Sequence, residues 1–455
     1  FFVRSMPRLL WRVYRGVAQC VFGTGYFRHP KRFLTRFMLP KALSLGGLLC
    51  LASGFAEGKR EDAKSEYGVS DVLVGTYTQK LGHVDGKGRG LYRFTLDHAT
   101  GVLSYVETLE SSANPTWLVK NPDPERPIVY ILNELYGEPG SIEVLELDKH
   151  TQQLKITQKV SSYGSGTCHG SISPDGRLLS IANYEGGVDE SKANHTRKTT
   201  RPKQEHNSSV VVYNLHPNGT IGEVAWKEPH PFPGSKVVQT RQMKSHAHCS
   251  VFVHTDADRY ALLAPDLGLD DVRTYLFDKY PKPKLISRGA IKAMPGAGPR
   301  HLCMHPKMNI AYVVNELDSS VSVIPLDNHG HPKNTTQVVG SLPNGFQAES
   351  TTAEILFHPS GSFVYVSNRV VGGEGIISCF KVDKQTGRLQ AQSYHGSGGV
   401  CPRAMEMFAD GRIMVVLNQD SDSIVSLFVD GSDGSLKTTG FKACCPSPVA
   451  AVSLN

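Results

Sequence analysis

Short apolar strands separated by Pro and Gly turns recur along this chain about every fifty residues. Residues 302–317 (LCMHPKMNIAYVVNEL) and 355–369 (ILFHPSGSFVYVSNR) show the unit most clearly, as strand, turn, strand and polar end. Short alternating strands at such a period are typical of propeller blades. Wrapping the units radially would protect strand edges that an open sheet of the same size exposes.

A polar residue closes each repeat at the same place. These polar ends are Asn133, Asn183, Asp266, Asn315, Asn368 and Asn418, with spacings of 50, 83, 49, 53 and 50. One interval therefore carries a large insertion, and a strand at residues 71–77 (DVLVGTY) supplies a seventh unit. We predict an all-β fold, a seven-bladed β-propeller over residues 70–455, with a polar insertion at about residues 187–209.

The polar ends indicate where chemistry should lie. A propeller gathers the equivalent ends of its blades around one axis, so we expect these residues to converge on a single funnel. A structural role competes for the asparagines, because Asn side chains readily bond turn backbone.

The net charge of +7 is misleading, because residues 1–60 contain eleven Lys or Arg and one acid, Glu57. The rest of the chain has 38 basic and 41 acidic residues, a net charge of −3. That balance gives the folded part no basic footprint for nucleic acid. No apolar run approaches the roughly twenty residues that a membrane-spanning helix needs.

Residues 1–56 have the character of a targeting segment. From Met38 the chain carries one Lys, an apolar run from Ala42 to Leu51 and small residues through Ala56, which is the layout of a secretory signal peptide. Residues 1–37, rich in Arg and free of acids, also suit a mitochondrial presequence. We expect the secretory pathway or an extracellular location, with mitochondria as the alternative, and either a fragment or a translation start at Met38.

Four glycosylation sequons agree with secretion: Asn194, Asn207, Asn218 and Asn334.

Seven cysteines remain beyond the signal: Cys168, Cys249, Cys303, Cys379, Cys401, Cys444 and Cys445. An odd number leaves at least one thiol unpaired within the chain, and the sequence does not fix the pairing. None of them shows the CxxC spacing of a zinc site, so we predict no structural zinc.

Nine motifs occur in order along the predicted propeller. They are LVGTYT (73–78), GLYRFTLDHATGVL (90–103), SISPDGRLLSIANY (171–184), HAHCSVF (246–252), APDLGLDDV (264–272), GAGPRHL (296–302), VVNEL (313–317), YVSNR (365–369) and NQDSDSI (418–424). Together they resemble the lactonase family that includes the propeller-type 6-phosphogluconolactonase and the 3-carboxy-cis,cis-muconate lactonising enzyme. The resemblance implies a seven-bladed propeller with a central cleft, and we predict no cofactor.

The resemblance further implies that one His, two Arg and one Glu line the cleft. Carried over residue by residue, the candidate catalytic residues are His248, Arg300, Glu316 and Arg369. The candidate substrate-binding residues near the same cleft are His169, His246, Asp266, Glu354 and Arg403. His246 and His248 lie two apart and would face the same side of a strand, a pattern that sometimes binds metal. Because no third ligand stands at a suitable spacing, we predict no metal.

Opening a lactone requires a nucleophilic water, a donor for the oxyanion and anchors for the ring substituents. Glu316 or a neutral His248 could act as general base. Arg300 and Arg369 could stabilise the oxyanion, or hold a phosphate or carboxylate of the substrate. An Arg beside Glu316 would lower the pKa of that carboxyl and weaken it as a base, so the base stays open between Glu316 and His248.

We expect a lactonase that hydrolyses a sugar lactone, similar to 6-phosphogluconolactonase, with a small anionic lactone held in a locally positive cleft. Two alternatives are a muconate-type cycloisomerase, which would move a proton without water, and a secreted propeller that binds without catalysis. A secretory location would require a lumenal source of phosphorylated substrate or a lactone without phosphate.

Overall fold

The computed structural model describes residues 68–454 except for 187–207, 256–257 and 280–282. The chain divides into two units, Phe1–Arg60 and Glu61–Asn455, and the described residues all belong to the second. The predicted targeting segment at residues 1–56 therefore lies outside the described residues.

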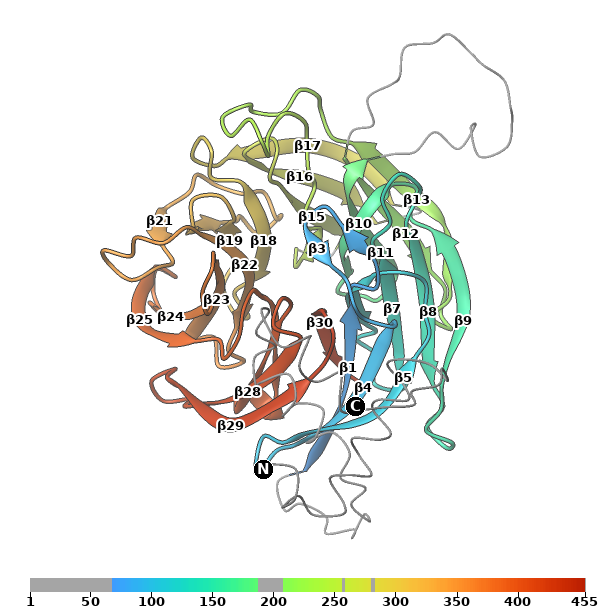
Figure 1. Ribbon diagram of the computed structural model, residues 1–455. Coiled ribbons are helices and arrows are strands. Elements are labelled where there is room, and N and C mark those ends of the chain that lie inside the picture. The colour runs from blue at the N-terminus through green and yellow to red at the C-terminus, as the bar shows by residue number, and fades with distance from the viewer. Residues whose placement is uncertain (1–67, 187–207, 256–257, 280–282, 455) are drawn as a thin grey trace, which may run out of the picture. The chain divides into compact units, whose positions relative to one another are not determined.

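The described chain forms seven four-stranded antiparallel sheets and one short hairpin (Figure 1). The first blade, from its inner to its outer strand, comprises β30 (Pro448–Ser453), β1 (Val69–Thr76), β4 (Leu91–Asp97) and β5 (Leu103–Leu109). The second comprises β6 (Pro115–Lys120), β7 (Ile128–Asn133), β8 (Ser141–Leu147) and β9 (Leu154–Ser161). The third comprises β10 (Ser165–Ile172), β11 (Leu178–Gly186), β12 (Ser209–Leu215) and β13 (Ile221–Pro229).

The remaining four blades follow in the order of the chain. The fourth comprises β14 (Val251–Val253), β15 (Arg259–Asp266), β16 (Asp271–Asp278) and β17 (Lys284–Lys292). The fifth comprises β18 (Pro299–Met304), β19 (Ile310–Asn315), β20 (Ser320–Pro325) and β21 (Gln337–Gly340). The sixth comprises β22 (Ser350–Phe357), β23 (Phe363–Val370), β24 (Ile376–Val382) and β25 (Leu389–Gly396). The seventh comprises β26 (Pro402–Phe408), β27 (Ile413–Asn418), β28 (Ser423–Val429) and β29 (Leu436–Cys444), with a 3-10 turn at Ala409–Gly411. The hairpin consists of β2 (Lys80–Leu81) and β3 (Val84–Asp85).

The first blade joins the two ends of the propeller. Its inner strand β30 comes from the C-terminal end of the chain and pairs antiparallel with β1, as Figure 1 shows. The inner part of each blade contacts the next one in turn, from β30 through β6, β10, β14 and β15, then β18, β22 and β26 back to β30. The blades therefore close into a ring, and the predicted seven-bladed propeller is confirmed.

Apolar side chains are buried mainly between neighbouring blades. Val72 and Phe94 of the first blade, for example, pack against Phe408 and Ile413 of the seventh. Because the second strand of a blade is covered on both faces, β7, β19 and β27 are buried at every position. The outer strand β9 instead alternates between partly buried and exposed residues. This layering explains why the sequence repeats continuous apolar runs next to alternating ones.

A one-residue register shift recurs in every blade, just past the polar end. In the second blade Asn133 pairs with Pro115 but Leu132 pairs with Trp117, so Thr116 is an extra residue. Thr76 is the equivalent of the polar end in the first blade, and the same shift follows there and in the other five. Such β-bulges re-aim a side chain out of the regular ladder. The residues that directly follow the partner of each polar end are Thr116, Cys168, His248, Arg300, Ala353, Arg403 and Val449.

The polar ends themselves do not converge on the axis, so that expectation is wrong. All of them are at most 1% exposed, and each side chain hydrogen-bonds at least one neighbouring group. Asn368 donates to the carbonyl of Ile376 (3.1 Å) and the hydroxyl of Ser378 (2.9 Å), and accepts from the hydroxyl of Ser341 (2.5 Å). Successive side chains of a strand point to opposite faces, so the residue after each polar end is the one free to face the axis.

The other sequence features fall partly within the described residues. Of the predicted insertion at residues 187–209, residues 187–207 lie outside them, and Ser209 already begins β12. Asn218 and Asn334 are exposed, whereas Asn194 and Asn207 are not described. The seven described cysteines are free thiols. Within the described residues, no helix has the length and apolar character needed to cross a bilayer.

Replacing Asn368 by Ala should lower the free energy of unfolding by about 3 kcal/mol, because three buried hydrogen-bonding groups lose their partner. Thermal or urea unfolding measures the change, and Asn344→Ala, at an exposed Asn of the same blade region, serves as the control. Equal stability of the two variants would contradict the structural role of the polar ends.

Candidate active site

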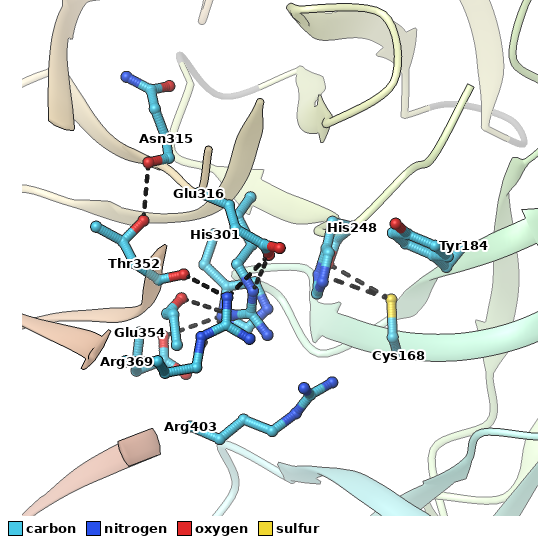
Figure 2. Close-up of polar contacts among 12 residues, drawn as sticks. Cys168, Tyr184, His248, His301, Asn315, Glu316, Thr352, Glu354, Arg369 and Arg403 are labelled. Carbon is cyan, nitrogen blue, oxygen red and sulfur yellow. Dashed lines mark hydrogen bonds and ion pairs between the residues drawn. The ribbon is translucent and has the colours of Figure 1, made fainter. Parts of the chain in front are cut away.

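A cleft of about 330 Å³ opens at the axis of the propeller. Its lining residues are His83, Glu134, Tyr136, Cys168, Tyr184, Arg241, His248, Glu316, Arg369, Cys401, Arg403, Gln419 and Asp420. Figure 2 shows several of these side chains, with Glu316 and Arg369 approaching from one side and Cys168 and Tyr184 from the other.

Two positions of the repeat supply most of this lining. The residue after the polar end contributes Glu134, Tyr184, Glu316, Arg369 and Gln419. The bulge position of the inner strand contributes Cys168, His248 and Arg403. Six of the seven blades thus present different side chains at these two positions, which suits an asymmetric small molecule.

Glu316 is held by three arginines from three different segments. Its Oε1 lies 2.7 Å from Nη2 of Arg241, and its Oε2 lies 3.0 Å from Nε of Arg300 and 3.2 Å from Nη2 of Arg369. We call Glu316 with Arg241, Arg300 and Arg369 the arginine clamp. Burial alone would raise the pKa of Glu316, but the charges of these arginines outweigh it and hold the pKa well below its usual range.

Further bonds fix the arginines of the clamp in place. Arg300 Nη1 donates to the carbonyl of Ala353 (2.5 Å), and Arg369 Nη2 donates to the carbonyl of Thr352 (2.8 Å). Thr352 in turn donates from Oγ1 to the carbonyl of Asn315 (2.9 Å), as Figure 2 shows. Burial, with the nearby positive charges, lowers the pKa of Arg300 to about 10, so it stays charged at neutral pH.

Arg403 belongs to the cleft but not to the clamp. Its Nη2 donates to the hydroxyl of Tyr77 (2.8 Å), and its guanidinium lies 5.2 Å from the centre of the Tyr77 ring. Among the described residues, no carboxylate lies within 4.0 Å of it. Burial raises the pKa of Tyr77 well above its usual value, so the phenol stays protonated. Arg403 is therefore a cleft cation with donors left for an anion.

His248 faces the cleft as a neutral ring. Burial lowers its pKa well below the usual value, and the positive charge of Arg300 acts in the same direction. Nδ1 of His248 lies 3.9 Å from Sγ of Cys168, which is a weak contact. The ring can donate or accept one hydrogen bond, but its protonated form is strongly disfavoured.

Four of the five predicted substrate-binding residues lie outside the cleft lining, three of them close to it. His169 stacks on Trp117 with 4.2 Å between ring centres, and it meets His301 at 5.0 Å. Glu354 lies 3.1 Å from Nδ1 of His301, and burial raises the pKa of Glu354 to about 7. His301 also approaches His248, at 5.1 Å between ring centres. His169 and Glu354 therefore support the cleft, whereas His246 stacks on the lining residue Tyr184 at 4.2 Å.

Asp266 does not face the cleft, because its side chain is used inside the fourth blade. One oxygen lies 2.6 Å from Nδ1 of His230, and the other accepts the backbone N–H groups of His246 (2.7 Å) and Leu269 (2.9 Å). The prediction that Asp266 binds substrate is therefore corrected to a structural role. Of the predicted residues, the structure brings His248, Glu316, Arg369 and Arg403 into the cleft lining, with Arg300 directly behind Glu316.

Several lining residues were missed from the sequence. Glu134, Tyr184 and Gln419 directly follow polar ends of the repeat, so the repeat itself held a signal for them. Arg241 comes from the long connection between β13 and β14, which lies outside the repeat and gave no such signal. His83 reaches the cleft from the hairpin of β2 and β3.

The charges that line the cleft balance one another. Arg241, Arg369 and Arg403 are matched by Glu134, Glu316 and Asp420, and the expected positive charge appears only when buried Arg300 is added. In the described part of the chain, no three His, Cys, Asp or Glu side chains are grouped so that they could hold a metal ion. The available chemistry is that of arginines, carboxylates, phenols and a neutral imidazole.

Known proteins are similar to this chain in sequence and in architecture. The chain is 27% identical over 376 residues to 6-phosphogluconolactonase of Bacillus subtilis, which covers 83% of this chain and 96% of that protein. A 6-phosphogluconolactonase of Formosa agariphila is 26% identical over 368 residues, covering 80% and 94%.

Solved structures of other proteins are similar to this fold. The periplasmic gluconolactonase of Pseudomonas aeruginosa superposes with a TM-score of 0.71 at 26% identity, covering 85% of this chain and 99% of that one. A Bacteroides fragilis protein, at 24% identity and a TM-score of 0.70, supports the fold alone. The family model described as a lactonase, 7-bladed beta-propeller matches residues 71–453, so the chain belongs to the lactonase family of seven-bladed β-propellers.

Proposed function

We propose that this protein hydrolyses a sugar lactone to the open-chain acid at the axial cleft. The observation that carries the proposal is that Arg403 lines the cleft with no carboxylate within 4.0 Å among the described residues, while the other three arginines each pair with Glu316. A cation left free beside a neutral His248 suits the oxyanion that forms when water adds to a lactone carbonyl. Two 6-phosphogluconolactonases and a gluconolactonase among the similar proteins support the same reaction class.

The arginine clamp favours hydrolysis over the cycloisomerase alternative. A muconate-type substrate carries several carboxylates, and each would need its own cation. Glu316 already pairs with Arg241, Arg300 and Arg369, so Arg403 is the one lining arginine of the described chain without a carboxylate partner. The tetrahedral intermediate of lactone hydrolysis carries one negative charge, on the former carbonyl oxygen.

The balance of charge among the lining side chains affects which lactone the cleft should prefer. A 6-phosphate would bring about two negative charges into a cleft whose lining arginines and carboxylates cancel. A sugar lactone without phosphate places hydroxyls against those same carboxylates and phenols at no charge cost. We therefore propose a plain sugar lactone as the preferred substrate, with the phosphorylated lactone as the competitor to test.

The purified protein should accelerate hydrolysis of glucono-δ-lactone above the spontaneous rate, and more than it accelerates hydrolysis of 6-phosphogluconolactone. Replacing Arg403 by Gln should lower kcat about 100-fold, because a donor to the oxyanion is lost. Release of acid, followed by a pH indicator with the uncatalysed rate subtracted, measures both.

Arg412→Gln, at an exposed arginine of the same blade, is the matched control and should keep full activity. A folded protein that accelerates hydrolysis of no sugar lactone would contradict the proposed function. It would leave a binding propeller as the alternative.

Replacing Glu316 by Gln should destabilise the protein by about 3 kcal/mol as well as reduce activity, because buried Arg300 loses its counterion. Thermal unfolding checks the stability, with Glu349→Gln at an exposed Glu as control. Lost activity at unchanged stability would instead identify Glu316 as the base.

We also propose that residues from Met38 form a signal peptide and that the protein is secreted and glycosylated, with mitochondrial import as the alternative. The exposure of Asn218 and Asn334 supports this. The full chain, expressed in animal cells, should appear in the medium with a mass that falls on treatment with an N-glycosidase. Recovery of an unglycosylated chain from mitochondria or cytosol would contradict it.

A further inference from the structure

We propose that Glu134 is the general base of the reaction, a role that rests on the proposed lactone hydrolysis. Glu134 directly follows Asn133 at the end of β7, as Glu316 follows Asn315 at the end of β19. The two carboxylates therefore occupy the same place in the second and fifth blades. Three blades is the largest separation in a ring of seven, so they face each other across the cleft that both line.

Glu134 is surrounded by neutral hydroxyl donors, whereas Glu316 is surrounded by arginines. The hydroxyl of Tyr136 donates to Oε1 of Glu134 (2.5 Å), and the hydroxyls of Tyr77 and Thr116 donate to Oε2 (2.8 Å each). Among the described residues, no Lys, Arg or His ring nitrogen lies within 4.0 Å of its oxygens. An ionised carboxylate offers about four acceptor sites. Three neutral donors thus orient Glu134 and leave one site on Oε1 for a water.

The two bases suggested by the sequence are each opposed by positive charge. Three arginines neutralise Glu316, and the same charges would have to be separated from it before it could take up a proton. Protonated His248 would face Arg300, and burial already holds the pKa of this ring well below its usual value. Within the described part of the chain, Glu134 has no ion-pair partner, so a proton transferred to it breaks no ion pair there.

Tyr77 ties the proposed base to the oxyanion site. Its hydroxyl donates to Glu134 and accepts from Nη2 of Arg403, at 2.8 Å in each case. A water beside Glu134 and a carbonyl oxygen beside Arg403 would thus be positioned by one hydrogen-bonded unit. Glu134 and Arg403 are thus close together but form no ion pair with each other. Both can therefore act on the same substrate.

The reaction balances with these groups alone. Glu134 takes one proton from the attacking water as the water oxygen bonds to the lactone carbonyl carbon, and the carbonyl oxygen becomes an oxyanion on Arg403. Collapse of this intermediate breaks the bond between the carbonyl carbon and the ring oxygen. Glu134 returns its proton to the ring oxygen, which leaves as a hydroxyl, and the new carboxylic acid ionises on release.

Replacing Glu134 by Gln removes the base while keeping the shape and an acceptor oxygen. Turnover of glucono-δ-lactone should fall at least about 100-fold in kcat with KM changed less than threefold, as expected of a lost general base. Glu138→Gln, at an exposed Glu four residues on, should match the parent protein. A raised KM at unchanged kcat would make Glu134 a substrate anchor and overturn the proposal.

Tyr136→Phe provides a test that does not depend on the folding of the Glu134 variant. Tyr136 is 36% exposed, and the change removes one hydroxyl that donates to the ionised carboxylate. If Glu134 is the base, the acidic limb of the kcat/KM profile moves to higher pH. An unmoved limb overturns the proposal.

Activity of the parent protein and of the Glu134→Gln variant tests the lactonase function and the role of Glu134 separately. An inactive parent protein would remove the lactonase function and the role of Glu134 with it. Active parent protein together with active Glu134→Gln would remove the role of Glu134 alone.

Discussion

The cleft depends on a constraint repeated in each blade, which is a buried polar side chain followed by a break in register. The polar end is buried and bonds neighbouring groups, as Asn368 does with Ser341 and Ser378. A bulge in the inner strand then adds one residue beside it, which turns a side chain such as Arg403 out of the ladder. Six of the seven blades thereby present at least one variable side chain to the cleft.

Charge pairing makes this repeated scaffold asymmetric. On one side, Glu316 is held in ion pairs with three arginines. On the other side, Arg403 and Glu134 share Tyr77 without touching each other. Since a buried ion pair must be broken before either partner can act, the unpaired side is the better place for bond making and proton transfer.

The sequence predicted the fold well because the repeat is local. The strand pattern and polar ends gave seven blades, and the motifs gave the family. The site was predicted in part. His248, Glu316, Arg369 and Arg403 do line one cleft.

Other features depend on which way a side chain points and on segments outside the repeat. Asp266 was placed in the cleft although strand alternation turns it toward His230. Glu134, one residue past a polar end, was overlooked for the same reason. Arg241 reaches Glu316 from a long connection, and no sequence spacing reveals such a contact.

In the proposed mechanism, the reacting carbonyl lies between Arg403 and Glu134. A crystal structure with gluconate, the product of the proposed reaction, tests it most directly. We expect the carboxylate of the product on the guanidinium of Arg403, with one oxygen within hydrogen-bonding reach of Glu134 and the arginine clamp intact. A product carboxylate bound to Arg241 or Arg369, with Glu316 displaced, would contradict it.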